Sequence, residues 1–138
     1  MDPHQMRRRC KGAHPRGAAH LAGHRLIFTW DSSVWRGGVG SIVADPAAEV
    51  WGVLWDITAE DERALDRYEL VHRDVYRKET VKVRAQSDDF DALVYVATAA
   101  EWRKPSKRYL AALLRGAKAH DLPAAYVAAL ACVETRPI

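Results

Sequence analysis

Runs of apolar residues separated by turn-forming residues predict five β-strands in the central part of the chain. Val50–Ile57 carries apolar side chains on both faces, which indicates a buried strand covered on both sides. Two later runs alternate apolar and polar positions on either side of Gln86–Asp89 and predict a hairpin. Asp45-Pro46 is expected to end the second strand, and Trp35–Gly38 to form a turn or a point of close approach. The predicted strands are Arg25–Trp30, Val39–Ala44, Val50–Ile57, Tyr76–Arg84 and Phe90–Ala97.

Helices are predicted at both ends of the chain and once between strands. Asp2-Pro3-His4-Gln5 combines an N-cap, a proline at the first helical position and a Gln that can close a capping box, so a helix should run to about Cys10. A second helix is expected to open at Thr58 and to end with Leu65–Glu69. This order of elements indicates an α+β fold with a small, strongly curved or closed sheet.

The C-terminal part predicts two further helices. Ser106 is a suitable N-cap after a proline. The residues that follow place an apolar stripe at helical spacing, after which Asp121-Leu122-Pro123 interrupts and a second apolar helix covers about 124–132. The stripe consists of Leu110, Leu113, Leu114 and Ala117.

Length and composition fit one globular domain spanning residues 1–138. Apolar residues make up 49% of the chain and charged residues 28%, which is ordinary for such a domain. No apolar run is long enough to span a membrane, and the N-terminus lacks the apolar stretch of a signal peptide. Cys10 and Cys132 are too far apart to suggest a disulfide framework. We therefore expect a cytoplasmic protein without a membrane partner.

Positive charge is concentrated near the N-terminus. Residues 1–36 hold seven Lys and Arg against two Asp, in a chain of net charge +3. Arg7-Arg8-Arg9 and Lys11 could contact nucleic acid. No aromatic residues interleave the cluster as stacking platforms, so a solvated helix face is favoured and no nucleic-acid partner is expected.

Motifs for metal, nucleotide or nucleophilic chemistry are weak. His20 and His24 are four residues apart, but Gly23 lies between them and no third ligand is evident. No Gly-x-Ser-x-Gly elbow occurs, and Gly37–Gly40 lacks the spacing of a dinucleotide-binding loop. We expect neither a metal ion nor a cofactor.

Glu69 is the candidate acid or base. It falls where a predicted helix end meets the sheet, and an apolar wall there would raise its pKa and improve it as a general acid/base. Helical geometry places it near Leu65, while Glu62 and Asp66 have room to face solvent. An exposed Glu69 at a helix end is equally consistent with the spacing. The aromatic residues Tyr76, Tyr95 and Tyr109 fit either a pocket or the core.

Five short blocks occur in an order and spacing that are specific as a set. They are Trp35–Ile42, Glu49–Trp55, Leu65–Val71 with Tyr76, Pro105–Tyr109 and Gly116–Pro123. From Met1 to about Leu130 this arrangement resembles the gamma-glutamylcyclotransferase family, whose members share an AIG2-like barrel. The resemblance implies a small closed mixed β-barrel with flanking helices.

The resemblance also implies an activity in glutathione metabolism: cyclisation of a γ-glutamyl amino acid or amine to 5-oxoproline with release of that amino acid or amine. Glu69 matches the catalytic glutamate, Tyr109 a tyrosine that contacts substrate, and Tyr76 and Tyr95 further pocket tyrosines. A small-molecule substrate is implied, without metal or cofactor. Two alternatives stay open, namely a cyclotransferase acting on γ-glutamyl-amines and a non-catalytic small-molecule-binding protein on the same barrel.

One family motif is not found. Members open with a strand ending Tyr-Gly-Ser-Asn, whose loop holds the glutamyl head group through backbone N–H groups, and this motif would precede Met1. Met1 and Asp2 match its last positions and are expected to bind substrate. The resemblance therefore implies an N-terminally truncated domain. We expect the 138-residue chain to be poorly soluble and nearly inactive, and an upstream extension to restore both properties.

Overall fold

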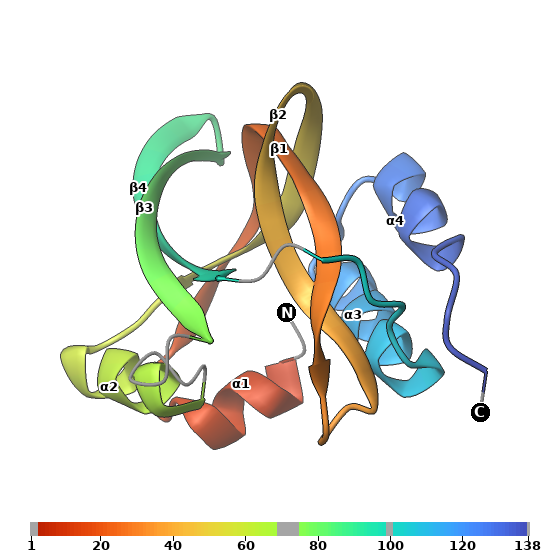
Figure 1. Ribbon diagram of the computed structural model, residues 1–138. Helices are drawn as coiled ribbons and strands as arrows, with labels where there is room; N and C mark the ends of the chain where they lie inside the picture. Colours follow the sequence, from red (N-terminus) through yellow and green to blue (C-terminus); the bar gives the residue numbers. More distant parts are fainter. Residues whose placement is uncertain (1–2, 69–74, 99–100, 138) are drawn as a thin grey trace.

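The computed structural model describes residues 3–68, 75–98 and 101–137 and has the α+β organisation that the sequence predicts. Figure 1 shows a strongly curved sheet with helices on two sides. In chain order the elements are α1 (Pro3–Arg9), β1 (His14–Ser32), β2 (Gly37–Asp56), α2 (Ala59–Tyr68), β3 (Tyr76–Ala85), β4 (Asp88–Ala97), α3 (Lys107–Ala119) and α4 (Ala124–Ala131). No helix in these described ranges has the length and apolar character needed to cross a membrane.

The sheet is curved but not closed, and its described pairs are all antiparallel. The strand order is β2-β1-β3-β4. The expectation of a closed mixed barrel is therefore wrong for the described strands. Between the outer strands β2 and β4, the bond found is from a backbone to a side chain: the Ala97 N–H donates to Ser41 Oγ at 2.9 Å. A bond of this kind brings the edges together without continuing the ladder.

Two of the predicted strands are parts of one long strand. Asp45-Pro46 was expected to end a strand, but it lies inside β2, where the register passes from Ala22↔Glu49 to His24↔Ala44. Four residues of β2, 45–48, thus stand opposite the single residue Gly23. A proline is tolerated at such a bulge because its missing N–H is not needed there. Gly23 itself has a φ of 73°, a conformation that suits glycine. The observed strands therefore number four in the described ranges, not five.

The other hairpin and the C-terminal helices agree with the sequence. β3 and β4 are joined through Gln86 and Ser87, whose φ angles of 51° and 69° are those that a two-residue hairpin turn requires. Ser106 caps α3 by accepting from the Tyr109 N–H at 3.1 Å. These elements carry strong local signals, which explains why sequence alone finds them.

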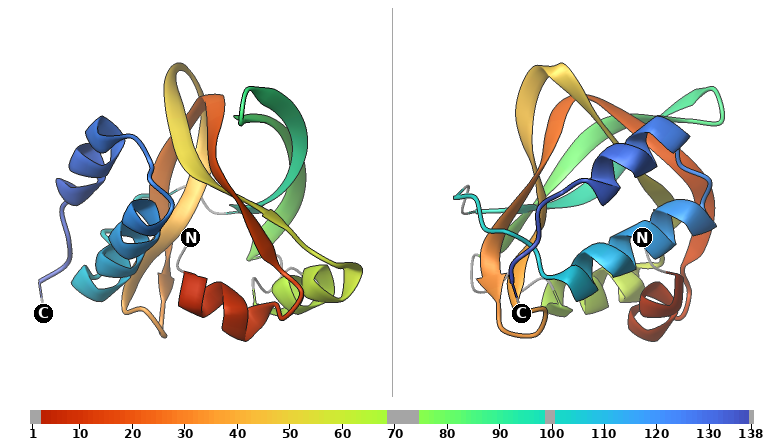
Figure 2. Two further views of the ribbon diagram at one scale, coloured as in Figure 1. Left: turned by 180° about the vertical axis from the view of Figure 1, so that it is seen from behind. Right: turned by 90° about the vertical axis from the view of Figure 1, so that its right-hand side faces the viewer.

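Two apolar clusters cover the two faces of the β1–β2 hairpin. On one face it packs against α3 and α4, which lie together in both views of Figure 2. On the other face it packs against β3 and β4. Trp51 belongs to the first cluster, and Val50 and Leu54 to the second, so both faces of this part of β2 are covered as predicted, although the residues are half-buried. The buried members are Phe28, Leu110, Ala117, Leu122 and Leu130 in the first cluster, and Ala19, Leu21, Val83 and Ala85 in the second.

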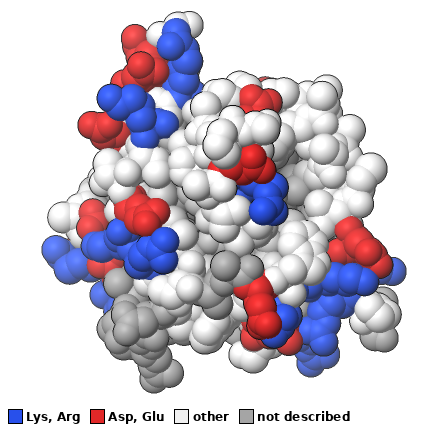
Figure 3. Space-filling model, turned by 45° about the horizontal axis from the view of Figure 1, so that its top comes forward, with Lys and Arg blue, Asp and Glu red and all other residues white. Residues whose placement is uncertain are grey.

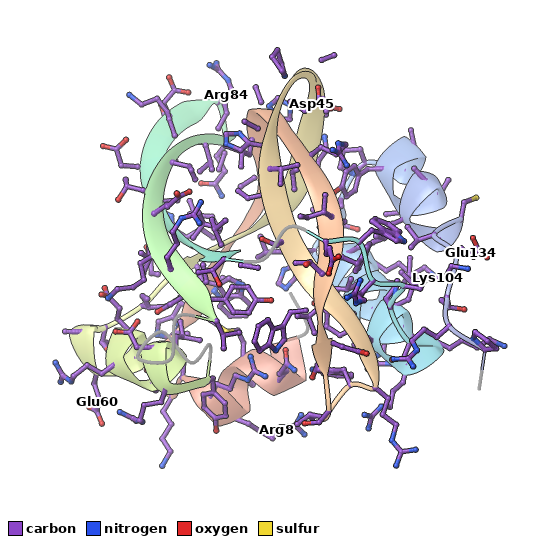
Figure 4. All side chains as sticks on the ribbon, viewed as in Figure 1. Arg8, Asp45, Glu60, Arg84, Lys104 and Glu134 are labelled. Atoms are coloured by element: carbon purple, nitrogen blue, oxygen red, sulfur yellow. The ribbon has the colours of Figure 1, made fainter. Side chains whose placement is uncertain are left out.

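The predicted close approach at Gly37-Gly38 is where the chain before α3 crosses β2. The Gly38 N–H donates to the Lys104 carbonyl at 3.0 Å. A Cβ atom on Gly38 would lie 2.0 Å from the Arg103 carbonyl oxygen. On its other side the crossing segment is held by the C-terminal tail, through an ion pair of 2.7 Å between Lys104 and Glu134, both labelled in Figure 4. This crossing fixes where α3 begins.

The first turn of α2 is held by a reciprocal pair of hydrogen bonds. The Asp61 N–H donates to Thr58 Oγ1 at 3.0 Å, and the Thr58 N–H donates to Asp61 Oδ2 at 3.0 Å. Asp61 Oδ1 also accepts from the Gly12 N–H at 3.3 Å, which ties α2 to the link between α1 and β1. The hydrogen bonds from the Thr58 and Gly12 backbone lower the pKa of this buried carboxyl.

We predict that Gly38→Ala destabilises the protein and that Gly52→Ala does not. The methyl group at position 38 meets backbone that must move, and overpacking of this kind costs about 1–3 kcal/mol or more. Gly52 is a matched strand control, because a Cβ atom there meets nothing within 4 Å. Thermal unfolding should show a fall of at least ~5 °C for Gly38→Ala. Equal melting temperatures for the two variants would contradict the close approach.

The lowered pKa of Asp61 predicts a defined pH dependence of stability. Its stabilising contribution is present above the unfolded pKa of about 3.9 and is lost as the pH falls through the lower folded pKa. The stability difference between the unaltered chain and Asp61→Asn should therefore be largest near neutral pH and shrink below about pH 4. Urea unfolding across this range measures it, with the exposed Asp91→Asn as control. A difference that stays constant or grows in acid would refute the role of Asp61.

Candidate functional site

A cavity of about 630 Å³ lies where α1, α2 and α3 meet the sheet. Its described wall comes from helices α1, α2 and α3, from all four strands and from the turn between β1 and β2. The three tyrosines singled out in the sequence all line it: Tyr76 from β3, Tyr95 from β4 and Tyr109 from α3. Residues far apart in the chain thus share one wall.

Two of these tyrosines hold the same glycine. Tyr109 Oη accepts from the Gly40 N–H at 2.8 Å, and Tyr76 Oη donates to the Gly40 carbonyl at 3.1 Å. A Cβ atom at Gly40 would lie 3.3 Å from Tyr109 Oη, so glycine allows this approach. The bond from Gly40 uses a lone pair of Tyr109 Oη and not its proton.

The ring of Tyr109 is held by aromatic neighbours. It meets Phe28 and Trp35 edge-on, with ring centroids 6.3 and 5.1 Å away. Its own backbone N–H is bound by the Ser106 cap. Helix start, ring and hydroxyl are therefore all fixed, which gives the Tyr109 hydroxyl a defined position in the cavity wall.

Tyr95 is held by a carboxylate that sequence reasoning assigned to solvent. Its hydroxyl donates to Asp66 Oδ1 at 2.6 Å, and Lys78 Nζ lies 3.1 Å from Asp66 Oδ2 and 2.8 Å from Glu62 Oε2. The Tyr95 hydrogen bond, followed by Lys78, lowers the pKa of Asp66. The two carboxylates, Glu62 first, raise the pKa of Lys78. Asp66 is thus an ionised acceptor that orients Tyr95.

The signal for this network was present but indirect. A tyrosine at a partly buried strand position needs a partner for its hydroxyl, and a helix carboxylate is a suitable one. Which of Glu62 and Asp66 serves depends on how α2 lies against β4. The periodicity of residues within the helix does not show at which angle α2 packs against β4.

Arg9 is the charged side chain in the described wall of the cavity. Its guanidinium carbon lies 4.7 Å from the ring centroid of Tyr68. The predicted solvated arginine cluster therefore divides: Arg7 and Arg8 are exposed, with Arg8 labelled beside α1 in Figure 4, while Arg9 is half-buried. On the face seen in Figure 3, basic side chains lie beside acidic ones and form mixed patches.

A second cavity of about 630 Å³ lies between the two hairpins. Five residues line both cavities: Met6, Val53, Trp55, Leu65 and Tyr95. Most of the wall of the second cavity is apolar, although Arg16, Asp56, Glu62 and Asp91 also line it. The first cavity holds more hydroxyl groups, from Ser32, Ser33 and four tyrosines, whereas Tyr95 is the one hydroxyl residue in the described wall of the second. A polar substrate therefore fits the first cavity better.

The histidines weighed as metal ligands have other contacts. His20 Nε2 lies 2.5 Å from Glu49 Oε2, and His24 Nδ1 lies 3.0 Å from the Ala22 carbonyl. Neither lines the cavity of the three tyrosines. Among the residues that the structure describes, no three His, Cys, Asp or Glu side chains are grouped to hold a metal ion.

Three of the predicted site residues fall outside the described ranges. These are Glu69, the predicted acid/base, and Met1 and Asp2, predicted to bind substrate. Residues of the cavity wall that sequence reasoning did not single out as site residues include Gly40, Arg9 and Trp30. Their roles depend on tertiary contacts that no local motif encodes.

Comparison with known proteins adds evidence independent of this geometry. The AIG2-like family matches residues 49–130. Human gamma-glutamylcyclotransferase is 34% identical over 104 residues, and the mouse protein of the same name is 33% identical. The match covers 75% of this chain and 55% of each relative, so the chain spans about half the length of these curated relatives.

Solved structures agree over nearly the whole chain. A gamma-glutamyl cyclotransferase superposes with a TM-score of 0.94 at 28% identity, covering 98% of this chain and 83% of its own. The crystal structure of a human protein gives a TM-score of 0.92 at 30% identity, covering 96% and 82%. The fold is therefore that of gamma-glutamyl cyclotransferase, and the chain belongs to the AIG2-like family.

Proposed function

We propose that the protein is a gamma-glutamylcyclotransferase, which converts a γ-glutamyl amino acid or amine to 5-oxoproline and the free amino acid or amine. The observation that carries the proposal is that Tyr76, Tyr95 and Tyr109 line the same cavity in a chain with this fold. The names of the human and mouse relatives agree with the proposal. A small-molecule substrate fits the volume of about 630 Å³.

The reaction needs no external nucleophile. The α-amine of the glutamyl group attacks its own γ-carbonyl carbon, a new C–N bond closes the five-membered ring, and the bond to the leaving amine breaks. One proton moves from the attacking amine to the departing one. Holding the substrate folded supplies much of the acceleration, since effective molarities of such intramolecular attacks reach about 10⁵–10⁸ M.

Glu69 is our candidate for the group that moves this proton. In the sequence it comes directly after Tyr68, whose side chain lines the cavity. Asp66 is a poorer candidate, because its pKa is lowered by the bonds from Tyr95 and Lys78. A general acid/base works best with a pKa near the working pH. Glu69 would act first as base and then as acid.

The tyrosines would bind and orient the substrate. Tyr109 and Tyr76 are positioned through Gly40, and Tyr95 through Asp66, so each hydroxyl is preorganised before substrate enters. Tyr76 and Tyr95 donate their protons to the Gly40 carbonyl and to Asp66, so their oxygens would accept hydrogen bonds from N–H groups of the substrate. By family resemblance, we assign Met1 and Asp2 to the glutamyl head group.

We predict that Glu69→Gln lowers 5-oxoproline release by at least ~100-fold while the protein stays folded, because Gln keeps the shape but cannot carry the proton. Glu60→Gln is the matched control: the same chemical change at an exposed position of α2. Turnover of γ-glutamyl-alanine is measured by chromatography and folding by circular dichroism.

Both variants are made in the 138-residue chain and in the same chain extended upstream by a strand that ends in Tyr-Gly-Ser-Asn. They are compared in whichever of the two lengths is more active. Turnover by Glu69→Gln at the level of Glu60→Gln would remove Glu69 from the mechanism. Tight binding of γ-glutamyl compounds without any turnover would favour a binding protein over an enzyme.

A further inference from the structure

Exposed apolar side chains gather at the same cavity. In the described part of the chain, five large apolar side chains are exposed, and three of them line this cavity: Trp30 at 42%, Val34 at 72% and Tyr68 at 55%. We call these three residues the apolar mouth. They come from the end of the β1–β2 hairpin and from the last residue of α2. Exposed apolar surface in one place marks a binding site more often than scattered residues do.

Trp30 is held at this position by a bulge in β1. Thr29 pairs with Val39 and Asp31 with Gly38, which leaves Trp30 as the extra residue between them. Its φ is 57°, a left-handed conformation that is rare for a bulky side chain and that glycine adopts most easily. Bulges next to active sites re-aim a side chain, and such backbone outliers cluster at ligand sites.

Two arginines lie against residues at the mouth, and the acidic residue next to Trp30, Asp31, is paired with Arg136 at 2.8 Å. Arg9 lies over the Tyr68 ring, and Arg108 lies 5.0 Å from the ring centroid of Trp35 and donates to the Val34 carbonyl. The described wall of the cavity contains no Asp or Glu. A leaving group with a carboxylate is favoured beside these arginines, whereas a cationic amine would find no counter-ion in the described wall.

We propose that the apolar mouth binds the leaving group and that Trp30 determines its specificity, selecting γ-glutamyl amino acids whose side chain is aromatic or large and apolar. The inference rests on the proposed cyclotransferase function and names the substrate class of that site. In the cyclisation, the bond that breaks releases this amino acid with the transferred proton on its amine. An indole face contacts an aromatic ring favourably, with offset or edge-on geometry.

The test is a comparison of kcat/KM for γ-glutamyl-phenylalanine, γ-glutamyl-glycine and ε-(γ-glutamyl)-lysine. The unaltered protein should favour the phenylalanine compound over the other two by about 10-fold, the size expected from filling an apolar pocket. Glycine adopts the positive φ of position 30 easily, so Trp30→Gly should not strain the backbone. In this variant the ratio of kcat/KM for the phenylalanine compound to that for the glycine compound should fall about 10-fold. Trp30→Phe should restore the ratio to within ~3-fold, because it keeps an aromatic face.

Trp102→Ala is the matched control, since Trp102 is 50% exposed but lies outside the cavity wall. Its ratio should equal that of the unaltered chain. An unchanged ratio in Trp30→Gly, or a preference of the unaltered protein for the glycine or lysine compound, overturns the inference.

Failure of the proposed function gives a different result. If none of the three compounds is turned over, equilibrium binding by calorimetry replaces kcat/KM. Tighter binding of the phenylalanine compound that is lost in Trp30→Gly supports the apolar mouth without catalysis. Equal or undetectable binding of all three compounds rejects it.

Discussion

The peptide group of Gly40 is the point on which the arrangement of the cavity depends. Tyr109 accepts from its N–H and Tyr76 donates to its carbonyl. Helix α3 and strand β3 are therefore both hydrogen-bonded to the same residue of β2. Neither bond belongs to a sheet ladder or a helix. The contact is favoured by glycine at position 40, where a Cβ atom would lie 3.3 Å from Tyr109 Oη. It also depends on a fixed start of α3 and on a curved sheet that brings β3 within reach of β2. Each condition is met by a separate local feature.

The fixed start of α3 is the clearest of these features. The Gly37-Gly38 pair lets the chain before α3 cross β2 at backbone contact distance, and Ser106 then caps the helix. A side chain at Gly38 would push the crossing segment away and move Tyr109 with it. The cavity wall thus depends on the absence of a side chain as much as on the presence of the tyrosines.

Electrostatics divides the acidic residues of α2 into distinct roles. Asp61 accepts a hydrogen bond at the start of the helix, and Asp66 accepts hydrogen bonds from Tyr95 and Lys78. Both have lowered pKa values, which keep them ionised and unsuited to proton transfer near neutral pH. The proposal that Glu69 moves the proton therefore rests on two arguments: the family resemblance, and the lowered pKa of Asp61 and Asp66.

Sequence predicts the parts of this fold that carry local signals. The β3–β4 hairpin, the Ser106 cap and the Gly37-Gly38 approach each follow from a few adjacent residues and are confirmed. Asp45-Pro46 was expected to end a strand, but it lies within β2, in the segment of β2 opposite Gly23. The closed mixed barrel was wrong for the described strands, since closure is a tertiary property that strand patterns do not report.

The site was predicted in part for the same reason. Tyr76, Tyr95 and Tyr109 were named from the family resemblance, and their side chains line one cavity. Asp66 was assigned to solvent and Arg9 to a solvated face, because the angle between a helix and its neighbours decides which side chains turn inward. Trp30 belongs to no sequence motif, and its position becomes clear from the structure, in which it is the extra residue of a bulge in β1.

The central claim is that the cavity held together at Gly40 binds the γ-glutamyl group. A crystal structure of Glu69→Gln soaked with γ-glutamyl-alanine tests it most directly, because a variant that cannot turn the compound over should retain it. The account predicts the glutamyl group in the cavity of the three tyrosines, with its γ-carbonyl within hydrogen-bond distance of at least one tyrosine hydroxyl. Density for the compound in the apolar cavity between the hairpins, or elsewhere on the surface, would contradict it.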